Sequence, residues 1–181
     1  LPMTKIHKGL IAGIFYQYAC TLKAYQALCE NGYENSEICI VMTLETWKEL
    51  FLDVLDGVYE QKPNKHVPFA SWQHLNNNKD PAKMKALICS SSIMQGPGIM
   101  LAGPISNIHS RVARNGIDIT KVLQKWGLSE ALSVQYEEEL LCGGIMIGTQ
   151  CRLQLQDKTI ADQWRTNKCA FIHQQQAIVV A

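Results

Sequence analysis

The stretch KGLIAGIFYQYACTLKAYQALCENGYENSEICIVMT, residues 8–43, decides the fold class because its apolar period changes twice. KGLIAGIF is short, aliphatic and bounded by polar residues, which is typical of a buried strand. QYACTLKAYQALCENGY then spaces apolar residues by three and four, which predicts a helix that ends at a left-handed Gly32. SEICIVMT is a second short apolar run, so the stretch predicts a strand–helix–strand unit with a crossover between parallel strands.

The last third of the chain has the same order of elements. Ser129 is the expected N-cap of a helix over EALSVQYEEELLCGG, which Gly143 and Gly144 end. IMIGTQC predicts a strand, Asp157 is expected to cap a helix over KTIADQWRTNKC, and AFIHQ predicts a last strand. The residues expected to face inward from these two helices are Leu132, Tyr136, Leu140, Leu141, Ile160, Ala161 and Trp164.

The two units and the segment between them predict an α+β fold. The order strand–helix–strand, insertion, strand–helix–strand is that of a ferredoxin-like sandwich, built as βαβ–insert–βαβ. We expect a single domain over residues 1–181, a length that one domain accommodates. Its parts are a first βαβ half plus a helix over residues 6–55, an insertion over 56–126, and a second αβαβ half over 127–181.

The insertion contains the stretch SIMQGPGIMLAGPISNIHS, residues 92–110. Thr43 is a plausible N-cap of the helix TLETWKELFLDVLDG that precedes it, and residues 59–81 form a polar loop. AKMKALICSSSIM and ISNIHSRVARNG can each form a helix, and a short helix follows Asp118. We therefore expect an apolar helical hairpin with this stretch at its apex and Pro104 at the first position of the second helix.

The same stretch has a second interpretation, as a glycine-rich loop that binds a phosphate. Such a loop presents successive backbone N–H groups ahead of a helix and usually includes a lysine. Pro97 and Pro104 each remove a donor, and no Lys-Ser or Lys-Thr pair follows. The sequence therefore favours a turn between apolar segments over a phosphate site.

The composition is that of a globular protein with little net charge. Hydrophobic residues make up 47%, charged residues 18%, and the formal net charge is +1. This balance predicts no strongly basic face and argues against nucleic acid as a partner. The densest basic patch, more typical of a solvated helix face, comprises Arg111, Arg114, Lys121 and Lys125.

No group of residues in the sequence combines a nucleophile, a base and an orienting group. Glu137, Glu138 and Glu139 are consecutive in a predicted helix, so their side chains point about 100° apart and cannot converge on one substrate. The histidines show no metal-ligand spacing; they are His7, His66, His74, His109 and His173. We therefore predict no catalytic, cofactor-binding or metal-binding residues.

The cysteines and the hydropathy favour a soluble, cytoplasmic protein. The seven cysteines are odd in number, form no Cys-x-x-Cys pair and lie mostly in apolar segments, which favours buried free thiols. They are Cys20, Cys29, Cys39, Cys89, Cys142, Cys151 and Cys169. We expect no signal peptide and no membrane span, because no apolar run reaches about 18 residues.

Three blocks of the chain resemble the bacterial general-stress proteins with a YflT-type domain, known as heat- or low-temperature-induced proteins of unknown function. The blocks cover residues 8–51, 96–106 and 127–150, and include GPGIMLAGPIS and GLSEALSVQYEEELLCGGIMIGTQ. The third block matches the family pattern at Gly127, Glu130, Tyr136, Glu137, Glu138, Gly143 and Gly144. The insertion departs from the alanine- and glycine-rich hairpin of that family. The resemblance implies a stress-associated, non-enzymatic bacterial protein and no catalytic residues.

These observations predict a protein that acts through self-assembly or protein interaction. A ferredoxin-like sheet leaves one face to be covered, which a homo-oligomer does, and the inserted hairpin would supply a second apolar surface. One alternative is a small-ligand or metal-binding module with a cleft between sheet and hairpin. Another is a peripheral membrane protein that binds through the hairpin. An enzyme is the last of the hypotheses.

Overall fold

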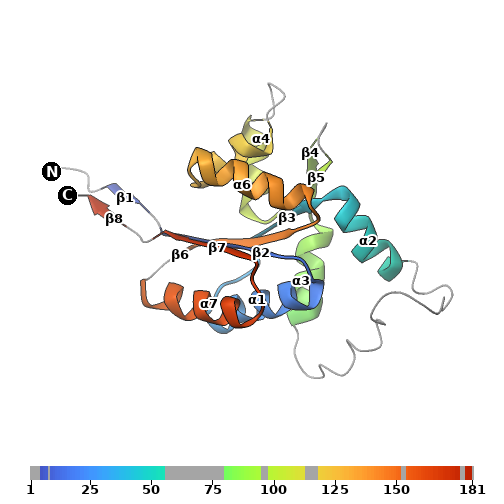
Figure 1. The fold of residues 1–181 in the computed structure, drawn as a ribbon, viewed down its shortest axis with the longest axis horizontal. Helices are drawn as coiled ribbons and strands as arrows, with labels where there is room; N and C mark the ends of the chain where they lie inside the picture. The colour runs from blue at the N-terminus through green and yellow to red at the C-terminus, as the bar shows by residue number, and fades with distance from the viewer. Residues whose placement is uncertain are drawn as a thin grey trace.

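The computed structural model describes residues 5–7, 9–55, 80–94, 98–112, 118–151, 154–175 and 178–180, and the fold they form is α+β (Figure 1). Among these residues, six strands form one antiparallel sheet in the order β4-β5-β3-β6-β2-β7. The strands are β2 (Gly9–Phe15), β3 (Ile38–Thr43), β4 (Ser92–Met94), β5 (Ile99–Ala102), β6 (Ile145–Cys151) and β7 (Phe171–Gln175). Strands β2 and β3 both run antiparallel to β6 and are therefore parallel to each other, as predicted for a crossover unit.

Helices lie on both sides of the sheet, above and below it in Figure 1. Helices α1 (Tyr18–Glu30), α3 (Asp80–Cys89) and α7 (Gln154–Thr166) cover what we call the first face. Helices α4 (Pro104–Val112), α5 (Ile119–Trp126) and α6 (Glu130–Leu141) cover the second face. Helix α2 (Leu44–Leu55) continues from β3 at the end of the sheet where β4 and β5 lie.

The central strands are buried on both faces. All seven residues of β2 are buried, and alternate side chains enter different cores because a strand has a period of two. Ile11 and Phe15 belong to the core of the first face, whereas Leu10 and Ile14 belong to that of the second. The expectation that one face of the sheet is left for a partner is therefore wrong. The helices between β3 and β6 close it.

A tryptophan packs against a strand glycine on each face. On the first face Trp164 lies over Gly13, where an added Cβ would come within 2.8 Å of the indole. On the second face Trp126 lies over Gly148, where an added Cβ would come within 2.5 Å of the ring. Glycine in a strand interior permits this close approach. Each indole thus reaches the backbone of a central strand.

Most elements begin and end where the sequence predicts. Gly32 has φ +84° after α1, the Asp118 carboxylate accepts a hydrogen bond from the Lys121 backbone N–H, and the Ser129 hydroxyl accepts one from Leu132 N–H. Asp157 is not an N-cap, since α7 begins at Gln154. The residues of α6 and α7 expected to face inward do so, except that Leu132 is half-buried and Leu141 is 63% exposed.

The expected helical hairpin is wrong, because SIM and IMLA of this stretch are the paired strands β4 and β5 at the edge of the sheet. Strand β4 pairs with β5, and β5 pairs with β3. All four residues of β5 are buried. This continuous apolar run is therefore a buried strand between β3 and β4, and not a turn between two helices. The helices that flank it lie on opposite faces and do not form a common apolar surface. The predicted start of α4 at Pro104 is confirmed.

Gly103 explains why the chain turns away from the sheet after β5. Its φ is +81°, and a Cβ at this position would lie 1.9 Å from the Ile38 carbonyl oxygen. Only glycine can pass so close to β3 in this left-handed conformation. The turn therefore sends the chain to the second face, where Ile105 of α4 is fully buried.

Candidate interaction site

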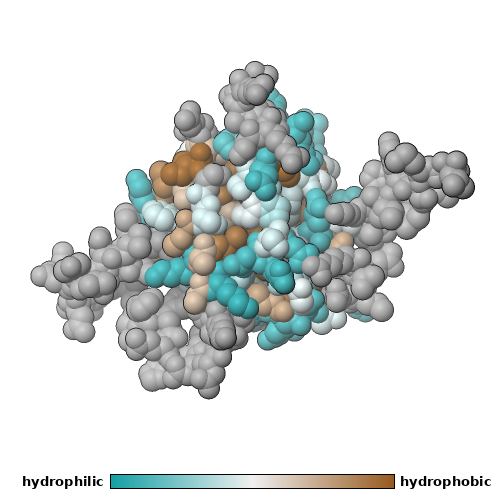
Figure 2. All heavy atoms as spheres, turned by 180° about the vertical axis from the view of Figure 1, so that it is seen from behind, coloured by the Kyte–Doolittle hydropathy of each residue, from teal (hydrophilic) through white to brown (hydrophobic). Residues whose placement is uncertain are grey.

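With both faces covered, the sheet keeps two edges, formed by β4 and β7. The β4 edge is three residues long, and its exposed apolar side chain is Ile93, which is 52% exposed. Figure 2, seen from behind, shows an apolar patch at this end of the molecule. Very short strands are one of the ways in which proteins limit pairing at an edge.

The β7 edge is longer. Strand β7 pairs with β2 on one side, from Ile14 opposite Phe171 to Leu10 opposite Gln175, and no strand among the described residues lies on its other side. Phe171 contacts the Tyr136 ring edge-on on the second face, with ring centroids 5.0 Å apart. Ile172 packs on the core of the first face. Both side chains are half-buried, so the edge presents apolar groups beside the outer backbone of β7, which pairs with no strand among the described residues.

A two-stranded ribbon extends this edge beyond the body of the molecule (Figure 1). Strand β1 (Lys5–His7) pairs with β8 (Ile178–Val180), with His7 opposite Ile178. Leu10 lies opposite Gln175. The step from His7 to Leu10 and the step from Gln175 to Ile178 are both three residues long. The ribbon therefore keeps the register of β2 and β7, and β8 continues the outer edge of β7. We call the outer edge of β7 and β8 the β7–β8 edge.

The sequence of this edge contains no charged residue and no proline. FIHQQQAIVV, residues 171–180, has no Asp, Glu, Lys, Arg, Pro or Gly. Charged residues and proline are the common means by which native edge strands are kept from pairing. The β7–β8 edge is therefore chemically suited to bind another strand.

Two titratable groups of β7 and its start, His173 and Cys169, are held in their neutral forms by burial. Burial lowers the pKa of His173, and burial raises the pKa of the Cys169 thiol to about 11. The Cys169 thiol lies 3.0 Å from the Phe171 carbonyl oxygen and 3.5 Å from that of Ile14, which anchors the start of β7 on β2. No charge repulsion at this strand opposes the approach of a neutral partner.

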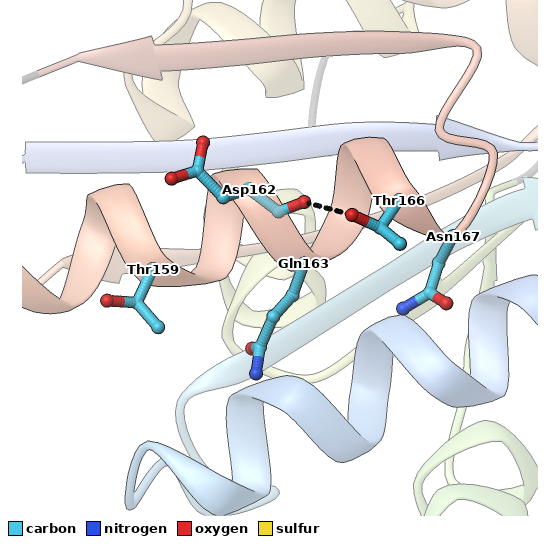
Figure 3. A pocket seen from close by; sticks show the side chains of 5 residues that line it. All are labelled: Thr159, Asp162, Gln163, Thr166 and Asn167. Carbon is cyan, nitrogen blue, oxygen red and sulfur yellow. Dashed lines mark hydrogen bonds between the residues drawn. The ribbon is translucent and has the colours of Figure 1, made fainter.

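A shallow depression of about 370 Å³ lies on the outer side of α7 (Figure 3). A second hollow lies between α7 and α1, and Gln163 and Asn167 line both. In Figure 3 these two side chains point toward α1. Asp162 pairs with Arg165 at 2.9 Å, and the Thr166 hydroxyl donates to the Asp162 carbonyl. The Gln163 Oε1 atom is buried and accepts no hydrogen bond from the described residues.

The three glutamates of α6 do not converge, as predicted. Glu137 accepts a hydrogen bond from the Thr120 hydroxyl at 3.1 Å, whereas Glu139 accepts one from the Tyr16 hydroxyl on the other side of the helix, and Glu138 is exposed. The bond to Glu139 raises the Tyr16 pKa to about 12. These contacts join α6 to α5 and to the end of β2, so they are structural.

The histidines and basic residues considered in the sequence are not brought together. His109 and His173 are half-buried on separate elements, while His66, His74 and Arg114, with the side chains of His7 and Arg111, fall outside the described residues. Lys121 and Lys125 are exposed on α5. Within the described ranges, no three His, Cys, Asp or Glu side chains are placed to hold a metal ion.

The cysteines are free thiols, as predicted, but not all are buried. Cys39 and Cys151 are buried; Cys20, Cys29 and Cys169 are half-buried; and Cys89 and Cys142 are exposed. The apolar segments around Cys89 and Cys142 suggested burial, but both residues lie at helix ends.

The described helices include none that is both long and apolar enough to span a bilayer. Comparisons with protein-family models, curated proteins and solved structures find no match to this chain. The sequence analysis did not identify the β7–β8 edge. The signal was available in the absence of charge and proline over residues 171–180, but it has meaning only once this strand is known to lie at an edge.

Proposed function

We propose that this chain is a non-enzymatic protein that acts through self-assembly or protein interaction. The observation that supports this function is the β7–β8 edge, which is neutral and free of proline, and whose strands have no partner on their outer side among the described residues. The sequence-based hypothesis used an inserted helical hairpin and an open sheet face as contact surfaces. Helices of the same chain cover that face, and β4 and β5 pair as strands where the helical hairpin was expected. The contact surface proposed here is therefore the sheet edge.

The proposal includes a ferredoxin-like core and a place among the YflT-type general-stress proteins. The order β7-β2-β6-β3, with α1 and α7 as connections on one face, supports a ferredoxin-like core to which β4, β5 and the helices of the second face are added. The family assignment rests on the three resembling blocks. A stress role predicts that transcript levels rise after heat, cold or salt stress, and unchanged levels under all three would remove it.

One alternative function has an observation in its favour. The buried Oε1 atom of Gln163 lies at the boundary of the two hollows between α1 and α7, where a small polar ligand with a donor group would satisfy it. Native mass spectrometry and elemental analysis of the purified protein test this alternative. A stoichiometric ligand or metal would favour it over assembly, and the bare chain mass would remove it.

Self-assembly is tested by sedimentation equilibrium of the wild-type chain over a range of concentrations. We expect a reversible dimer or higher oligomer. A chain that stays monomeric at every concentration up to about 100 µM would have a dissociation constant above that value. This result would remove self-assembly from the proposed function.

A further inference from the structure

We propose that a second copy of this chain binds along the β7–β8 edge, antiparallel and about a two-fold axis at Gln175. The inference rests on the proposed self-assembly and names its partner and its surface. In this arrangement β7 of each copy lies beside β8 of the other, and the sheets of the two copies become continuous. Such an interface is isologous, with the same residues contributed by both copies.

The edge sequence is nearly symmetric about Gln175. FIHQ precedes this residue and QAIV follows it, so reversal about Gln175 matches Gln with Gln, Ile with Ile and Phe with Val, whereas the counterpart of His173 is an alanine. Antiparallel pairing centred on Gln175 sets Ile172 opposite Ile178 and Phe171 opposite Val179. Directly opposed apolar residues stabilise an antiparallel pair, and a second copy supplies them in the matching order.

The two-fold axis is also consistent with the pleat of the strands. In an antiparallel pair, directly opposed residues lie on the same face of the sheet. Positions 172 and 178 differ by six, an even number, and the pair His7–Ile178 has the same register as the pair Leu10–Gln175. Each apolar pair therefore lies on one face of the continuous sheet.

The ribbon of β1 and β8 is explained by the same arrangement. It extends beyond the helices (Figure 1), and an isolated two-stranded ribbon is only marginally stable in water. In the proposed dimer each ribbon lies against β7 of the other copy, and the two helical bodies are displaced to opposite ends. The ribbon thereby gains a third strand.

Charge excludes some other occupants. The edge has no charged side chain, and His173 is neutral at neutral pH because burial lowers its pKa. A strongly charged segment would lose its hydration there without gaining an ion pair. A neutral strand of matching pattern is the better partner, and this chain carries one.

The experiment is a charge exchange at the axis. Gln175 is exposed, so Gln175→Lys and Gln175→Glu should leave the fold of the monomer intact, as the thermal unfolding of each variant checks. In the homodimer each variant sets two like charges directly opposite each other, which opposes pairing. We expect each variant alone to dissociate at least about fivefold more readily than the wild type, and an equimolar mixture to regain the dimer. The matched control is Ile93→Lys, which places a charge on the β4 edge.

The outcomes separate the inference from the function on which it rests. If the wild type dimerises, both Gln175 variants dissociate and their mixture reassembles, the inference holds. If the wild type dimerises and the Gln175 variants do so equally well, the β7–β8 edge is not the interface, although self-assembly stands. Dissociation by Ile93→Lys instead assigns the contact to β4. A monomeric wild type overturns both the inference and the proposed self-assembly.

Discussion

On both faces of the sheet a tryptophan packs on a strand glycine, but the helices that cover the two faces come from different segments of the chain. On the first face, Trp164 lies over Gly13, and two of the three helices, α1 and α7, connect the strands of the two strand–helix–strand units. On the second face, Trp126 lies over Gly148, and all three helices come from the segment between β3 and β6. The comparison teaches that this insertion completes the domain. It closes the face that a simpler sheet would offer to a partner, and it leaves the edges for association.

The largest expected effect is the loss of either tryptophan. Trp164 is fully buried and donates a hydrogen bond from Nε1 to the Ala24 carbonyl, and Trp126 is 3% exposed. Trp164→Ala and Trp126→Ala should each lower the free energy of unfolding by about 3–5 kcal/mol, since each leaves a large cavity on a central strand. Urea unfolding measures both. A loss under about 1 kcal/mol for Trp126→Ala would mean that the second face is only loosely covered.

A smaller effect is expected at the turn that sends the chain to the second face. Gly103→Ala should cost about 2–3 kcal/mol, because the Cβ meets the Ile38 carbonyl and the φ is positive. Gly32→Ala is the matched control: its φ is +84° but no atom lies within 4 Å of the added Cβ, so about 1 kcal/mol is expected. Thermal unfolding of the pair compares them. Equal losses would remove the steric role given to Gly103.

The next effect is that of one hydroxyl on the second face. Tyr136 is fully buried, and its hydroxyl donates to the Ala12 carbonyl on β2 at 2.9 Å. Tyr136→Phe should cost about 1–2 kcal/mol, because it leaves a buried carbonyl without this donor. Tyr16→Phe, at an exposed hydroxyl bonded to Glu139, should cost less. Urea unfolding measures both losses of stability. A larger loss for Tyr16→Phe than for Tyr136→Phe would contradict the role of the Tyr136 hydroxyl in joining α6 to β2.

The smallest effect is a pH dependence at the β7 edge. Burial lowers the folded-state pKa of His173, so the unfolded chain binds a proton more readily. This contribution to stability is present above the unfolded pKa of about 6.5 and is lost as the pH falls below it. Tyr136 and Cys169, which lie near His173, stay neutral in this range because burial raises their pKa values. His173→Gln should show a weaker decline of stability between neutral and acidic pH, and an unchanged decline would refute the assignment.

Much of the local structure could be predicted from the sequence on both faces of the sheet. The periods of residues 8–43 identify β2, α1 and β3, and the caps at Asp118 and Ser129 locate α5 and α6. These predictions succeed because caps and apolar periods are local. The helical hairpin failed because its decisive contact is not local: Gly103 passes the backbone of β3, about 60 residues earlier in the chain.

The interaction site could not be predicted for the same reason. The neutral composition of residues 171–180 is visible in the sequence, but a strand is an edge only when the order of all strands is known. The sequence also did not predict that helices cover the second face. Alternate residues of the same buried strand enter the two different cores. An apolar run in which every residue is buried does not reveal which helix covers which side.

The most direct test of closed faces and an open β7–β8 edge is amide hydrogen exchange of the wild-type chain at a low and a high concentration. Outward-facing amides of an edge strand exchange readily in the monomer and become protected when a second strand pairs with them. We predict that peptides covering β7 and β8 gain protection at the higher concentration, while those of β4 and of the helices on both faces do not. Gain of protection in the helices of either face or in β4, with β7 and β8 unchanged, would contradict the account.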